Sequence, residues 1–350
     1  MRPIASVINP RRRAGGAGRP DAAGRVPSRG EASDGAHYFA WGSMLVAALL
    51  TGCATARPKA KAPAPWPRYA LEAAQIRQLN LPTGERFDAS GLCFAPNGDL
   101  LTVSDRGPSV YRIEFIADTN AADVVKLPDC FTPEQLAPFS AEKTGRYDCE
   151  GVAADELGRL YLCEEENRWI LRWDPLSRRV ERLNIDWSPV QKYFSPTDRN
   201  ASFEGIAIGG GRLYVANERE QGRIIVVDLR TLKVTDDFEV RPAVASFWGP
   251  HYSDLCWFRG ELFVLMREDH VILRIEPRSH RVLAEYDFRA LEFAPENKYR
   301  LVLPFVGVME GLAVDDRDFW LATDNNGLGR ARYPRDTRPT LFRCPRPDRR

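Results

Sequence analysis

The chain repeats one short pattern five times, and this repetition constrains its fold more strongly than any local propensity. Each copy opens with an acidic residue or a serine, usually followed by glycine and an apolar residue, and then makes a turn into an apolar strand. The copies open at Ser90-Gly91-Leu92, Glu150-Gly151-Val152, Glu204-Gly205-Ile206, Asp254-Leu255-Cys256 and Glu310-Gly311-Leu312. Counted from position 91 to 151, 205, 255 and 311, the steps are 60, 54, 50 and 56 residues. That length suits four strands and their turns, so the repetition predicts an all-β propeller.

One blade per copy gives five blades, with six as the alternative if residues 116–145 contain a degenerate one. A single blade cannot bury both faces, so the ring must close. We expect residues 74–81 to pair with the last blade, whose third strand is expected at residues 329–333. The longer insertions, at residues 116–145, 186–200 and 289–299, are expected to gather on one face.

The N-terminal region differs in composition from the repeats. An Arg-, Gly- and Ala-rich stretch leads into an apolar run from residue 39 to 50, which ends in Leu50-Thr51-Gly52-Cys53 and is followed by Pro/Ala-rich sequence. This order resembles a bacterial lipoprotein signal. A short buried or membrane-spanning helix is the alternative, but the run has about 12 residues where a span needs about 20. We therefore predict a signal segment at 1–52, a lipidated Cys53 with a linker to residue 68, and a single domain at 69–350.

Charge and cysteine content limit the expected partners. Lys plus Arg number 49 and Asp plus Glu 48, so no overall field attracts nucleic acid. We expect a monomer held at the membrane of the bacterial cell envelope by Cys53, with the outer membrane and periplasm favoured. Six of the seven cysteines remain in the folded domain, and Cys130 and Cys149, which bracket the first insertion, are expected to form a disulfide.

The first strand of each propeller blade lines the central channel, so the residues that open the copies should face one axis. These residues are Ser90, Glu150, Glu204, Asp254 and Glu310. Four carboxylates in a partly desolvated space repel one another, so they must be protonated, pair with a base or hold a cation. An oxygen-only ligand set without His or Cys favours Ca²⁺. The alternative is a structural role, in which these side chains accept backbone N–H bonds or pair with arginines at the ends of the second strands.

A second ring of charges and one histidine complete the candidate site. The second strands end at Asp105, Glu165, Glu218, Arg267 and Asp324, which we expect to be solvated charges or outer ligands. Of the four histidines, only His251 stands just ahead of a ring residue, so it is the candidate general base. Glu204 is the other residue expected to handle a proton. The chain lacks the Gly-x-Ser-x-Gly, phosphate-loop and dinucleotide motifs, which disfavours serine nucleophiles and nucleotide use.

The motifs that open the copies resemble those of the SdiA-regulated family of bacterial envelope β-propellers. They are also similar to the propeller domains grouped under "esterase-like activity of phytase". The resemblance spans residues 87 to about 333. It implies an exported propeller with a central Ca²⁺ site and, for the phytase-like group, a phosphoesterase or esterase activity; calcium-dependent propeller lactonases are more distantly similar.

Two functions follow from these expectations. The first is a lipid-anchored binding protein whose loop face docks a small molecule or an envelope protein. The aromatic residues expected on that face are Trp187, Tyr193, Phe194, Trp248 and Tyr252. The second is a Ca²⁺-dependent esterase or phosphoesterase, phytase-like or lactonase-like. The shortage of an evident nucleophile or base in the sequence favours the first.

Overall fold

The computed structural model describes residues 65–143, 145–198, 201–247, 249–301 and 306–349. The expected signal segment at 1–52, the lipidation site Cys53 and the linker as far as residue 64 lie outside these residues. In the part of the chain that is described, no helix is both long and apolar enough to cross a membrane.

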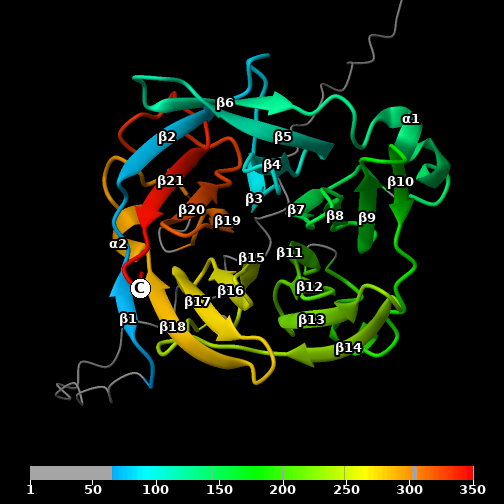
Figure 1. The fold of residues 1–350 in the computed structure, drawn as a ribbon. Helices are drawn as coiled ribbons and strands as arrows, with labels where there is room; N and C mark the ends of the chain where they lie inside the picture. Colours follow the sequence, from blue (N-terminus) through cyan, green and yellow to red (C-terminus); the bar gives the residue numbers. More distant parts are fainter. Residues whose placement is uncertain (1–64, 144, 199–200, 248, 302–305, 350) are drawn as a thin grey trace, which may run out of the picture. The chain divides into compact units, whose positions relative to one another are not determined.

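Five four-stranded antiparallel blades surround a central axis (Figure 1). Blade 1 contains β3 (Ala89–Phe94), β4 (Leu100–Ser104), β5 (Gly107–Phe115) and β6 (Ala121–Lys126). Blade 2 contains β7 (Cys149–Ala154), β8 (Leu160–Glu164), β9 (Trp169–Asp174) and β10 (Arg179–Arg182). Blade 3 contains β11 (Phe203–Gly209), β12 (Arg212–Asn217), β13 (Arg223–Asp228) and β14 (Lys233–Phe238). Blade 4 contains β15 (Tyr252–Phe258), β16 (Glu261–Met266), β17 (Val271–Glu276) and β18 (Arg281–Asp287).

Blade 5 joins the two ends of the folded region. It contains β19 (Met309–Val314), β20 (Asp318–Thr323), β21 (Thr340–Pro345) and the N-terminal strand β2 (Gln75–Asn80). The expected five blades and the expected pairing of the N-terminal strand are therefore confirmed. The expected third strand at residues 329–333 is wrong. That segment lies in two consecutive turns, in which Tyr333 N donates to Arg330 O and Asp336 N to Tyr333 O, and Pro334 between them has no N–H for a strand ladder.

The N-terminal strands connect three blades. β2 pairs antiparallel with β21 of blade 5 and parallel with β6 of blade 1, so blades 5 and 1 form one continuous sheet. Just before it, β1 (Arg68–Ala70) pairs parallel with β18 of blade 4. Arg68 Nε also lies 2.6 Å from Glu285 Oε1 on β18. The chain ahead of the first repeat thus holds the ring closed.

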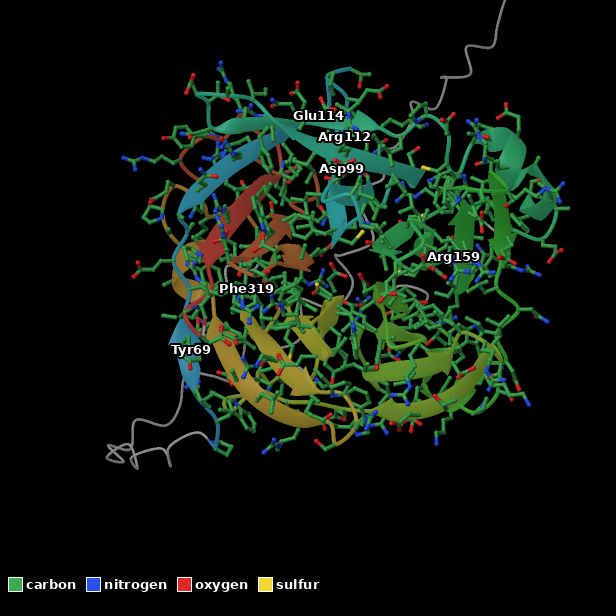
Figure 2. The ribbon with its side chains drawn as sticks, viewed as in Figure 1. Tyr69, Asp99, Arg112, Glu114, Arg159 and Phe319 are labelled. Atoms are coloured by element: carbon green, nitrogen blue, oxygen red, sulfur yellow. The ribbon has the colours of Figure 1, made fainter. Side chains whose placement is uncertain are left out.

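Apolar side chains fill the spaces between neighbouring blades. Phe263 of blade 4 packs against Phe319 of blade 5 with ring centroids 5.9 Å apart, and Tyr286 stacks on Tyr69 of β1. Figure 2 shows Tyr69 and Phe319 on these elements, and it shows Arg112 on the outer strands of blade 1, where it donates to Glu114. The blades are therefore bound to one another mainly by apolar packing.

Strand direction brings the long connections to one end of the channel, which we call the mouth. Each inner strand begins at the mouth, and four alternating strands return the chain there. The connections 127–148, 183–202, 239–251 and 288–308 therefore begin and end at the mouth, as does the long loop 324–339 within blade 5. They include the short helices α1 (Pro133–Leu136) and α2 (Arg289–Glu292) and match the expected insertions.

The expected disulfide between Cys130 and Cys149 is wrong. All six described cysteines are free thiols. Cys130 and Cys149 are buried in the same apolar cluster between blades 1 and 2, where burial raises the pKa of Cys130 to about 12 and that of Cys149 well above its usual value. They behave as small buried hydrophobic residues.

Candidate functional site

Each inner strand carries a β-bulge at the mouth, and the bulge decides which side chain faces the channel. The pairing register with the second strand skips a position between Cys149 and Gly151, and it does the same at the equivalent place in the other four blades. The residues left out of the ladder are Ser90 with Gly91, then Glu150, Glu204, Ser253 and Glu310. In blade 4 the bulged residue is thus Ser253. The sequence repeat predicts Asp254 there, which is one residue too far along the chain.

The glycine that follows the bulge is required by close contact between inner strands. A Cβ atom on Gly91 would lie 3.0 Å from the Gly151 Cα, and one on Gly151 would lie 2.9 Å from the Gly205 Cα. No side chain fits in that space, so glycine is needed at these positions. Blade 4 breaks the pattern, because Asp254 occupies its glycine position.

Asp254 uses its carboxylate to tie three inner strands together. Its Oδ2 accepts hydrogen bonds from the backbone N of Leu92 at 3.2 Å and of Leu312 at 2.7 Å, and its Oδ1 accepts from Leu255 N at 2.8 Å. Burial raises the pKa of Asp254 well above its usual value, while these three bonds act in the opposite direction. Asp254 therefore satisfies edge N–H groups of β3 and β19, which corresponds to the structural alternative for the ring residues.

The other predicted ligands line an acidic mouth together with the ends of the second strands. Its carboxylates are Asp105, Asp148, Glu150, Glu165, Glu204, Glu218, Glu310 and Asp324. Arg267 occupies the fifth second-strand position, and its Nη2 lies 2.6 Å from Glu218 Oε1 while Nη1 pairs with Glu310. Arg219 also pairs with Glu218. These two arginines neutralise the side of the mouth formed by blades 3, 4 and 5.

Burial and mutual repulsion raise the pKa values of the mouth carboxyls. Burial contributes most for Glu150, followed by the charges of Glu204 and Glu165, and its pKa rises well above the usual range. For Glu310 burial outweighs the opposing charge of Arg267, and the pKa is about 7. The pKa of Asp105 rises to about 6, mainly through burial. The mouth thus holds more carboxyl groups than its arginines can balance.

The excess is concentrated on blade 2. Ligand oxygens of Asp148, Glu150 and Glu165 lie within 4.8 Å of one another, the single such grouping among the described residues. Glu165 Oε1 and Asp148 Oδ1 are buried and have no hydrogen-bond partner among the described residues. Of the four predicted metal ligands, Glu150 belongs to this group. Glu204 and Glu310 line the same mouth on the side of Arg267, and Asp254 binds backbone amides.

Sequence reasoning placed Glu165 in the second ring and missed Asp148. Asp148 immediately precedes the first residue of β7, the same position that His251 holds ahead of β15. The backbone repeats this equivalence, because Glu165 N donates to Asp148 O at 2.8 Å just as Glu218 N donates to Ser202 O in blade 3. Extending the repeat by two residues toward its N-terminus would have found Asp148.

His251 and Glu204, the predicted proton-handling residues, both lie at the mouth. His251 Nδ1 is 3.9 Å from Glu218 Oε1. Burial and the charges of Arg267 and Arg219 lower the pKa of His251 to about 3, so its imidazole is neutral and only weakly basic near pH 7. Burial and the charges of Glu218 and Glu165 raise the pKa of Glu204 well above its usual value, which favours the protonated form of its carboxyl.

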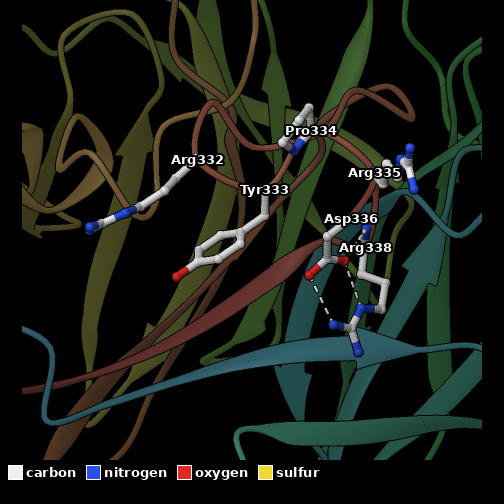
Figure 3. A pocket seen from close by; sticks show the side chains of 6 residues that line it. All are labelled: Arg332, Tyr333, Pro334, Arg335, Asp336 and Arg338. Atoms are coloured by element: carbon white, nitrogen blue, oxygen red, sulfur yellow. Dashed lines mark hydrogen bonds and ion pairs between the residues drawn. The ribbon is translucent and has the colours of Figure 1, made fainter.

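The aromatic residues expected to dock a partner are largely used inside the fold. Tyr252 is buried and its hydroxyl donates to Val240 O at 2.9 Å. Trp187 and Phe194 pack on buried Phe203, and Tyr193 lies under the guanidinium of Arg223. Trp248 lies outside the described residues. A separate surface pocket, formed by Arg332 to Asp336 and Arg338, contains none of the predicted site residues (Figure 3).

Comparisons with known proteins support the propeller fold and identify a protein family. A family model described as "Phytase-like: Esterase-like activity of phytase" matches residues 87–327. No match was found among curated proteins. Glutaminyl cyclase from Myxococcus xanthus is similar in structure, with a TM-score of 0.53 and 14% identity over 80% of this chain and 97% of that one. Virginiamycin B lyase from Staphylococcus aureus has a TM-score of 0.37 and 14% identity, over 74% of this chain and 66% of that one.

We expect Asp254→Ala to destabilise the fold without removing a response to Ca²⁺. The substitution leaves three buried N–H groups without an acceptor, at about 1–3 kcal/mol each, and Asp254→Asn, which keeps one oxygen, should cost less. Denaturant unfolding measures both variants, with Asp316→Ala in an exposed ion pair as the control. A Ca²⁺-dependent rise in melting temperature that disappears in both Asp254 variants would instead make Asp254 a ligand.

The raised pKa values predict the pH dependence of stability in the presence of a chelator. A carboxyl with a raised folded pKa stabilises the fold when protonated, so this contribution is complete below its ordinary pKa and is lost as pH rises toward the folded value. For Glu310 that window runs from 4.5 to about 7, and for Asp105 from 3.8 to about 6. A tenfold difference in proton affinity between the folded and unfolded chain corresponds to about 1.4 kcal/mol. Thermal melts should show Tm falling from about pH 5 to about pH 7.5; a rising Tm would contradict the electrostatic description.

Proposed function

The chain belongs to the phytase-like family, and from this membership together with the acidic mouth we propose that it is a Ca²⁺-dependent hydrolase of ester or phosphoester bonds. The observation that carries the proposal is the group of Asp148, Glu150 and Glu165, with ligand oxygens within 4.8 Å of one another. Most of the aromatic residues that were expected to bind a partner are packed inside the fold. We therefore favour a hydrolase over a binding protein.

The residues present fit a hard divalent cation. The three carboxylates supply only oxygen ligands, which Ca²⁺ prefers. Ca²⁺ also tolerates variable ligand distances, whereas Mg²⁺ requires a near-ideal octahedron. Two of the oxygens, Glu165 Oε1 and Asp148 Oδ1, are buried without a hydrogen-bond partner, and ligation would satisfy them. Asp148, Glu150 and Glu165 would hold the ion. When bound, the ion supplies positive charge that polarises an ester or phosphoryl oxygen.

The surrounding side chains would neutralise charge, transfer protons and bind the inner strands together. Arg267 fixes Glu310 and Glu218 by ion pairs on the opposite side of the mouth, so that half remains neutralised. Asp105, with a pKa of about 6, is mostly ionised near neutral pH and can accept a proton, whereas the raised pKa of Glu204 favours its protonated form, which can donate one. His251 stays neutral and offers a ring nitrogen with no hydrogen-bond partner. Asp254 closes the channel below by binding the inner-strand amides.

Hydrolysis of aryl phosphates, aryl acetates and lactones by the purified chain tests the proposal. We expect turnover that a chelator abolishes and Ca²⁺ restores. Asp148→Asn and Glu165→Gln should each lower it at least about tenfold, since even indirect partners of a metal ion cost that much. Glu156→Gln, an exposed carboxylate in the turn at the far end of the β7–β8 hairpin, is the matched control.

Turnover that a chelator does not affect would exclude the metal-dependent mechanism. Ca²⁺-dependent stabilisation without turnover of any of the three substrate classes would leave a structural ion and return the chain to the binding function.

We also propose that the protein is exported and held in the cell envelope through Cys53, as the Leu50-Thr51-Gly52-Cys53 sequence and the apolar run before it suggest. Kinship with the SdiA-regulated envelope propellers belongs to the same proposal. Cys53→Ser should move the protein from the membrane fraction to the soluble fraction and remove the mass of the attached lipid. An unmodified Cys53 in the mature wild-type protein would contradict lipid anchoring.

A further inference from the structure

We propose that Arg106 and Arg146 form an anion-binding pair that holds the phosphoryl group of a phosphoester beside the Asp148–Glu150–Glu165 group. This assignment rests on the metal-dependent hydrolysis proposed above and names the class of ester that the site accepts. It also gives roles to two charged side chains that the acidic site leaves without one.

Both arginines stand at the rim of the mouth where blades 1 and 2 meet. Arg106 lies in the β4–β5 turn directly after Asp105, and Arg146 lies two residues ahead of Asp148. Arg146 Nη2 is 3.9 Å from Asp105 Oδ2 and 3.8 Å from Asp148 Oδ2, and its side chain is 59% exposed. Arg106 is exposed as well, and its positive charge is close enough to act on Asp148. Both guanidinium groups therefore border the acidic group from the solvent side.

The two arginines differ from the other cations at the mouth in how firmly they are paired. Arg267 is 16% exposed and paired with Glu218 and Glu310, and Arg219 is paired with Glu218. Arg86 Nε lies 2.5 Å from Asp88 Oδ2. By contrast, the guanidinium of Arg106 makes no hydrogen bond or ion pair with any described residue, and both contacts of Arg146 are long. At the side of the mouth where blades 1 and 2 meet, these two side chains are therefore able to turn toward an incoming anion.

A phosphoryl group matches this arrangement better than a neutral ester does. Guanidinium groups bind phosphate oxygens with paired, charge-assisted hydrogen bonds, and a neighbouring divalent cation attracts the same oxygens. A carboxylic ester carries no anionic oxygen and gains nothing from the two arginines. Without a cation the surrounding carboxylates repel phosphate, so we expect its binding to require Ca²⁺.

Calorimetric titration of the purified full chain with inorganic phosphate tests the pair without any need for turnover. With saturating Ca²⁺ we expect binding, and with a chelator we expect at least about tenfold weaker binding. The double variant Arg106→Gln/Arg146→Gln should weaken phosphate binding by at least about tenfold, because charge-assisted hydrogen bonds to the phosphate oxygens are lost. Its Ca²⁺-dependent rise in melting temperature should remain. With substrates, KM for an aryl phosphate should rise while KM for an aryl acetate is unchanged.

The pocket of Figure 3 provides the matched control. Arg332 and Arg335 are exposed, form no ion pair with described residues and lie on the loop between β20 and β21. Arg332→Gln/Arg335→Gln removes the same charge and should leave phosphate binding unchanged.

The outcomes separate this assignment from the function on which it rests. The proposed arginine pair is wrong if phosphate does not bind the Ca²⁺-loaded wild type. It is also wrong if both double variants lose phosphate binding to the same extent. Loss from the Arg332/Arg335 variant alone moves the anion to the Figure 3 pocket and also overturns it. If Ca²⁺ neither stabilises the wild type nor supports hydrolysis, the proposed function itself fails.

Discussion

The close approach of the five inner strands is the constraint on which the rest of the molecule depends. Glycine at the position after the bulged residue in four blades lets neighbouring inner strands come nearly into backbone contact, and Asp254, which replaces it in blade 4, reaches from β15 to bind amides of β3 and β19. Strands that converge this closely bring their bulged residues together as well. Three glutamates from three different sheets thereby share one small volume, and the electrostatics of the mouth follow from that crowding.

The mouth handles this crowding unevenly around the axis. The residue after the second strand is acidic in blades 1, 2, 3 and 5. In blade 4 it is Arg267, which pairs with acidic residues of blades 3 and 5. Among the described residues, the ion pair made with the group of Asp148, Glu150 and Glu165 comes from Arg146, which is largely exposed and lies 3.8 Å from Asp148. Because Arg267 stands where the other blades have an acidic residue, one side of the mouth is neutralised and the other side remains acidic. The uneven distribution of charge, rather than the number of acids, is what gives the site a direction.

The architecture and much of the site could be predicted from the repeat, because a recurring glycine and turn identify a blade whatever the surrounding residues are. The errors arose where the fold departs from its own repeat. Ser253-Asp254-Leu255 can be aligned in two ways, and only the bulge in the pairing register shows that Ser253 is the equivalent of Glu150. In blade 5 a long loop precedes the third strand, β21. Local strand propensity at residues 329–333 therefore placed the predicted third strand in this loop. Asp148 was missed because it lies just outside the motif that recurs.

Ring closure by β2 has a consequence for how the protein is made. Gln75 pairs with Arg343, so a strand near the start of the folded region waits for nearly the whole remaining chain before it finds its neighbour. Contacts so distant in sequence form slowly. In a nascent chain β2 can pair with β6 of blade 1, but the other edge of β2, which later pairs with β21, stays open until synthesis is almost complete.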